Sequence, residues 1–221
     1  MKHFLIRCLN MVTGIFLYAL GIVLMINAKI GYAPWEVFHV GLAKTIGLSI
    51  GVTSIVAGIV IVIIVTIFGE KLGLGTICSM ILTGVFIDLI FYIDVIPVID
   101  NFIVGIFVLI AGLIIISLGS YYYIKSAFGV GPRDNLMVVL ARITKLPVGF
   151  CRSAVEVLVT LIGWVLGGML GIGTVISAIA IGFFIQITFR VFRFDVTAIR
   201  HETLFEKFVN IFGTVVKQKT K

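Results

Sequence analysis

The sequence predicts an all-α, polytopic membrane protein: six transmembrane helices in two inverted three-helix repeats, each repeat with a short re-entrant or interfacial half-helix. Three observations predict this class. The chain of 221 residues is 61% hydrophobic, only 12% charged and has a mean hydropathy of +1.25. Its apolar runs approach the ~20 residues that cross a bilayer as helix and exceed the ~10 of a barrel strand. The second half of the chain also repeats the first.

Six apolar segments are long enough to span the membrane. They cover residues 8–27, 49–68, 75–93, 102–124, 148–167 and 173–190. Two shorter segments, 34–44 and 132–142, reach only about half way across the hydrocarbon at ~1.5 Å per residue. We therefore expect six spans and two half-helices.

The basic residues predict the orientation of these spans. With the N-terminus in the cytoplasm, fourteen of the 17 Lys and Arg lie on the cytoplasmic side. The exceptions are Lys29 and Lys44 outside, and Arg152 just within the fifth span. The positive-inside rule then supports six spans with both termini in the cytoplasm. The net charge of +7 is read as this topology signal, so no nucleic-acid partner is expected.

The two halves match without a gap when the chain is shifted by 98 residues. Apolar bias alone would align Ile, Leu and Val, but not a set of small and turn-forming residues, so duplication explains the match. The matched pairs include Gly21/Gly119, Gly31/Gly129, Pro34/Pro132, Gly51/Gly149, Gly69/Gly167, Gly73/Gly171, Gly75/Gly173, Thr76/Thr174, Ser79/Ser177 and Gly84/Gly182.

Each copy contains three spans, an odd number, so the second copy enters the membrane from the opposite side. Inverted repeats of this kind are typical of secondary transporters, whose substrate site lies at the repeat interface near the midplane. Channels and membrane proteins without transport activity also contain them. We divide the chain into a first repeat at 1–99, a second at 100–192 and a cytoplasmic, basic, amphipathic tail at 193–221.

The half-helices begin at two related motifs, GYAPWE at 31–36 and GVGPRD at 129–134. Gly permits a sharp turn, Pro suits the first helical position, and an acid in the first turn complements the helix dipole. A base near each end, Lys44 or Arg142, is expected to meet the negative end of its own short helix. Two such starts converging near the midplane would hold a polar or anionic group, whereas helices lying flat at the interface would not. The candidate substrate-binding residues are Pro34, Trp35, Glu36, His39, Pro132, Arg133, Asp134 and Asn135.

Ionisable residues inside spans are the second set of candidates, because burying a charge in hydrocarbon is costly. Asp88 lies in the third span. Glu156 lies in the fifth, with Arg152 four residues before it and on the same helix face. Glu156 and Arg152 are consistent with a neutral structural ion pair or with a coupling carboxylate, and both alternatives stay open.

No cofactor or metal is expected, because Cys8, Cys78 and Cys151 are widely spaced and the three histidines are scattered. No set of side chains resembles a catalytic centre, so we do not expect this protein to have enzymatic activity. The tail has apolar residues at helical spacing among its bases, which predicts a helix on anionic lipid. The lipid bilayer is thus the expected partner, with an unknown small-molecule solute and a possible homo-oligomer.

At GYAPWE and GVGPRD, with GLGT and GIGT in the later turns, the chain resembles the bacterial YczE/YyaS/YitT family of integral membrane proteins. The resemblance covers essentially the whole membrane part and implies a multi-pass inner-membrane protein. It supplies no binding residues.

The repeat and its polar motifs favour a secondary transporter, exporter-like, that carries a small organic solute or amphiphile by alternating access between inverted repeats. The alternative is a non-transporting membrane scaffold or assembly factor that acts through its cytoplasmic loops and tail.

Overall fold

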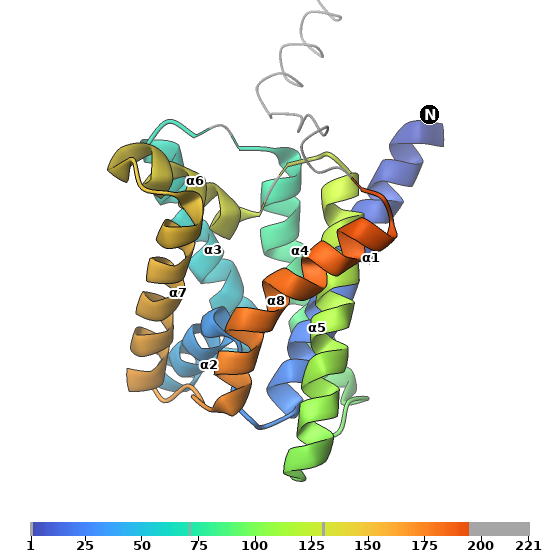
Figure 1. Ribbon diagram of the computed structural model, residues 1–221, viewed down its shortest axis with the longest axis vertical. Coiled ribbons are helices and arrows are strands. Elements are labelled where there is room, and N and C mark those ends of the chain that lie inside the picture. The colour runs from blue at the N-terminus through green and yellow to red at the C-terminus, as the bar shows by residue number, and fades with distance from the viewer. Residues whose placement is uncertain (1, 71, 130, 195–221) are drawn as a thin grey trace, which may run out of the picture.

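A computed structural model describes residues 2–70, 72–129 and 131–194, which form an all-helical bundle (Figure 1). The predicted tail helix lies outside the described residues. The helices are α1 (Lys2–Asn27), α2 (Pro34–Ile46), α3 (Ile50–Ile67), α4 (Leu74–Ile93), α5 (Phe102–Lys125), α6 (Pro132–Thr144), α7 (Val148–Val165) and α8 (Ile172–Val191).

The predicted spans are confirmed as helices. Six of the eight, all but α2 and α6, are long and apolar enough to cross a membrane. Five begin and end within two residues of the predicted positions. The first is longer than expected, because α1 starts at Lys2 rather than at residue 8. Polar residues end an apolar run without ending a helix, so hydropathy alone misplaces this start.

Local chemistry sets the helix ends. Pro34 and Pro132 each occupy the first helical position, where the missing N–H is not needed. The Ser49 side chain accepts from the Val52 N–H at the start of α3. The Asn101 side chain likewise accepts from the N–H groups that open α5. These caps satisfy donors that a helix leaves without intrahelical partners.

The repeat is visible in the backbone. The bounds of α2, α3 and α4 recur 98 residues later in α6, α7 and α8. Contacts between the halves also recur in exchanged pairs. The Gly75 N–H donates to the Phe128 carbonyl at 2.8 Å, and the Gly173 N–H donates to the Ile30 carbonyl at 2.8 Å.

The centre of the bundle is an antiparallel contact between α1 and α5. A Cβ added at Gly14 would lie 2.8 Å from the Gly119 carbonyl oxygen, and one at Gly21 would lie 2.7 Å from that of Gly112. Glycine is therefore required for this approach of the two backbones. Buried Ile22, Met25, Leu109, Leu113 and their neighbours form the main core on either side of the contact.

The bases Lys44 and Arg142 lie in the last turns of α2 and α6, as predicted, and each also contacts the other half of the chain. The Lys44 ammonium donates to the Gly167 carbonyl at 2.9 Å, at the end of α7. The Arg142 guanidinium donates to the Phe68 carbonyl at 2.6 Å, at the end of α3. Each base therefore caps a long helix of the other half while lying at the end of its own short helix. The sequence predicts the position of each base at its own helix end, but it cannot show the contact with the other half.

Candidate functional site

The two short helices lie towards opposite ends of the bundle, and their first turns approach each other inside it (Figure 1). An ion pair joins them: Arg133 Nη1 of α6 lies 3.5 Å from Glu36 Oε1 of α2. Glu36 is 5% exposed, and a quarter of the Arg133 side chain remains accessible. The structure thus brings together the two motifs that the sequence analysis singled out.

Residues of α2 surround the Arg133 guanidinium. Its Cζ lies 4.7 Å from the centre of the Trp35 ring, a cation–π geometry. Its Nη2 lies 3.5 Å from Nδ1 of His39, which is 2% exposed. The planar guanidinium can meet a carboxylate, a ring face and an imidazole together, which an ammonium cannot do equally well.

A second ion pair lies on α7. Arg152 Nε donates to Glu156 Oε1 at 2.9 Å, with the four-residue spacing expected from the sequence. The Arg152 side chain is about half exposed, whereas that of Glu156 is 17% exposed. Arg133 is the main charge near Glu36, and Glu156 is also near enough for a weaker electrostatic interaction with it.

Asp134 is the third carboxylate of this region. It follows Arg133 in the first turn of α6 and is exposed. The charges of Arg152 and Arg133 both act on it, yet neither pairs with it. We call Glu36, His39, Arg133, Asp134, Arg152 and Glu156 the central cluster. Its three carboxylates outnumber its two guanidinium groups, and among the described residues only Asp134 of the three lacks an ion pair.

The remaining predicted residues lie near the cluster or apart from it. Pro34 and Pro132 are buried at the helix starts. Asn135 is 5% exposed, and its Nδ2 has no hydrogen-bond partner among the described residues. Asp88 lies elsewhere, near the end of α4, where it accepts hydrogen bonds from the start of α3. A coupling role for Asp88 stays a prediction, and its observed contacts are those of a helix cap.

The sequence analysis missed two tyrosines. Tyr18 of α1 lies within electrostatic range of four charged side chains of the central cluster: Arg133, Glu36, Asp134 and Arg152. Tyr123 of α5 is also within electrostatic range of Asp134, and its hydroxyl lies 3.4 Å from Ser79 Oγ. The available signal was a break in the repeat: the positions equivalent to Tyr18 and Tyr123 hold Ile116 and Met25.

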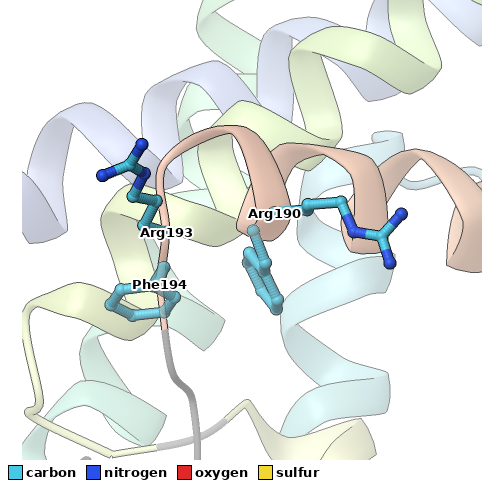
Figure 2. Close-up of a pocket in the computed structure, with 4 residues that line it drawn as sticks. Arg190, Arg193 and Phe194 are labelled. Carbon is cyan, nitrogen blue, oxygen red and sulfur yellow. The ribbon is translucent and has the colours of Figure 1, made fainter.

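A shallow hollow at the end of α8 is not a comparable site. It is lined by Phe189, Arg190, Arg193 and Phe194. The two guanidinium groups point away from each other (Figure 2), so they do not converge on one ligand.

Comparison with known proteins identifies relatives but no solved fold. A family model described as "Family of unknown function (DUF6198)" matches residues 5–190. The chain is 33% identical over 175 residues to the uncharacterized membrane protein YczE of Bacillus subtilis, covering 78% of this chain and 80% of that protein. It is 33% identical to an uncharacterized protein of Haemophilus influenzae, covering 78% and 81%. It is 30% identical to the uncharacterized protein YyaS of Bacillus subtilis, covering 74% and 83%. No solved structure matches.

Proposed function

The chain belongs to the DUF6198 family, and for this family member we propose a secondary transporter, exporter-like, that carries a small organic solute or amphiphile by alternating access between two inverted repeats. The proposal includes a bacterial inner membrane, as the family resemblance implies, and cytoplasmic termini, as the positive-inside rule predicts.

One observation carries the proposal: the short helices α2 and α6, which lie towards opposite ends of the bundle, bring their first turns together at a charged cluster. Arg133 of one short helix contacts Glu36, Trp35 and His39 of the other. Broken helices whose N-terminal ends meet at a repeat interface are the recurrent substrate site of secondary transporters. Charges of this kind within a spanning bundle are costly and are usually retained for transport or coupling.

The charges of the central cluster favour a positively charged solute group. Arg133 and Arg152 are each engaged by a carboxylate, so neither is left for an anion. Asp134 is exposed and forms no ion pair with any residue that the structure describes. A cation beside Asp134 would balance the cluster, whereas an anion would have to displace Glu36 or Glu156. The sequence analysis expected a polar or anionic group at the starts of the short helices, and the charges of the central cluster lead us to propose a cationic group there.

Flux in proteoliposomes tests the proposal. We would first measure stabilisation of the purified protein by quaternary ammonium compounds and by carboxylates matched to them in size. The best stabiliser would then be loaded into proteoliposomes and its counterflow measured. We expect the quaternary ammonium members to be carried, with flux reduced at least tenfold by Asp134→Asn and Arg133→Ala.

Two results would contradict this proposal. Transport of the matched carboxylates alone would overturn the charge assignment. Flux that is unchanged in both variants would remove the central cluster from the mechanism.

The scaffold alternative is separated by deleting residues 198–221. A transporter should retain most of its flux after this deletion, since the site lies in the bundle. A scaffold acting through its tail should lose its cellular role while its fold persists.

A further inference from the structure

The two halves differ in how their last two helices pack. In the first half, α3 and α4 lie against each other. In the second half, α7 and α8 diverge from their connecting loop (Figure 1), and no comparable contact joins them within the described chain. Helices with matching bounds and related sequences therefore adopt two arrangements in one molecule.

The contact between α3 and α4 depends on two buried glycines. A Cβ added at Gly84 would lie 2.5 Å from the Gly51 carbonyl oxygen, and one added at Gly51 would overlap the Gly84 carbonyl. The equivalent residues in the second half are Gly149 and Gly182, and both are exposed. An added Cβ at either of these would meet no described atom within 4 Å. The second half thus has the same two glycines, but they do not pack against each other.

A carboxylate fastens the closed pair. The Asp88 carboxylate accepts hydrogen bonds from the Ser49 hydroxyl and, at 2.8 Å, from the Gly51 N–H. The equivalent residues in the second half are Gln186, Pro147 and Gly149. Gln186 is exposed, and its amide oxygen can accept from the Gly149 N–H as Asp88 accepts from Gly51. Pro147 has no donor to match Ser49.

We infer that α7 and α8 form a gate with a second, closed state, in which Gly149 packs against Gly182 and Gln186 accepts from the Gly149 N–H. In that state α3 and α4 separate, because the two halves exchange arrangements. The structure shows the state with the α3–α4 gate closed and the α7–α8 gate open. This state is favoured because two hydrogen bonds to a charged carboxylate are stronger than one to a neutral amide.

The gates control access to the central cluster. Glu36 and Asp134 occupy equivalent positions, but Glu36 is buried and Asp134 is exposed, so the two halves of the cluster differ in accessibility as the two gates do. The open gate faces the end of the bundle where α1 begins, since the start of α7 lies there (Figure 1). The exchange would close that end and open the opposite one, which gives the proposed transport a physical means.

Distances between spin labels test the inference without any solute, so its failure is distinct from a failure of the transport proposal. The background replaces Cys8, Cys78 and Cys151 by alanine. One label pair replaces Val56 and Val85 across the α3–α4 gate, and its repeat equivalent replaces Ala154 and Phe183 across the α7–α8 gate. Both pairs are measured by double electron–electron resonance in phosphatidylethanolamine–phosphatidylglycerol nanodiscs.

We expect the α7–α8 pair to show a long distance and a minor shorter one. Asp88→Asn should increase the shorter population about tenfold, since it removes the charge from two hydrogen bonds. The label pair across α3 and α4 should show a longer-distance population that increases by the same factor. Gly182→Leu should abolish the shorter α7–α8 distance, because its side chain occupies the closing surface, where an added Cβ meets no described atom within 4 Å in the present state.

Two results would overturn the inference. One is a single long α7–α8 distance in both the unmodified background and Asp88→Asn. The other is a short population that Gly182→Leu leaves unchanged. The second result would show that the helices approach by another surface.

Discussion

Residues at equivalent positions in the two halves have come to different environments. Glu36 is buried and paired with Arg133, whereas Asp134 is exposed and has no ion pair within the described ranges of the chain. The residue types at both motifs were readable from the sequence, and so was the four-residue spacing of Arg152 and Glu156. The Glu36–Arg133 ion pair could not be predicted from the sequence, because it depends on where two helices that are far apart in the chain meet.

The Glu36–Arg133 pair should contribute to stability mainly through the cost of breaking it. Arg133→Ala leaves a buried carboxylate without its partner, and we expect a loss of about 3 kcal/mol in the free energy of unfolding. Unfolding in mixed micelles with increasing denaturing detergent measures this loss. The matched control is Arg152→Ala, whose partly exposed pair should contribute less than about 1 kcal/mol. Equal losses would contradict this ranking.

The cross-half caps provide a second prediction at this scale. Lys44→Ala and Arg142→Ala should each lower the unfolding free energy by about 0.5–1 kcal/mol, since each removes a cation from a helix C-terminus. Arg142→Ala should cost more, because Arg142 also lies 3.1 Å from Glu70 Oε2. The controls are Lys44→Arg and Arg142→Lys, which keep a cation at each helix end and should change the unfolding free energy less than the alanine variants. A larger effect of Lys44→Ala in the same unfolding assay would contradict the assignment.

Helices were the best-predicted elements. Long apolar runs set the spans, and the Pro and Gly positions set the starts of α2 and α6. The contacts between helices were harder to predict. A glycine repeat indicates close packing but not the partner, so the α1–α5 contact and the divergence of α7 from α8 could not be read from it. A faithful repeat in sequence would in fact predict equal packing in both halves.

The two kinds of glycine should respond differently to alanine. Gly21→Ala places a Cβ 2.5 Å from Ile116 Cγ1 and 2.7 Å from the Gly112 carbonyl oxygen, so we expect a loss of about 1–3 kcal/mol. Gly182→Ala meets open space and should be neutral or stabilising by up to about 1 kcal/mol through helix propensity. Thermal unfolding of the two purified variants compares them, and destabilisation by Gly182→Ala would show a contact there in the resting state.

At the scale of the molecule, the beginning of α1 and the end of α8 lie towards the same end of the bundle (Figure 1). Together with the distribution of basic residues, this predicts that the 94–101 loop faces outwards and the 145–147 loop faces the cytoplasm. In a chain without its native cysteines, a membrane-impermeant maleimide should label Val98→Cys in intact cells. Leu146→Cys should react only after permeabilisation. The reverse pattern would invert the proposed topology and the direction of the gates.

The partnership of α1 with α5 has a consequence for how the protein is made. The principal surface of α1 is covered by a helix that begins about 75 residues after α1 ends, in the other half of the chain. During synthesis, the glycine face of the first span therefore remains exposed to lipid until the fourth span has been inserted. Neither half is a complete folding unit, and a ribosome that stalls between them leaves a product without the partner it needs.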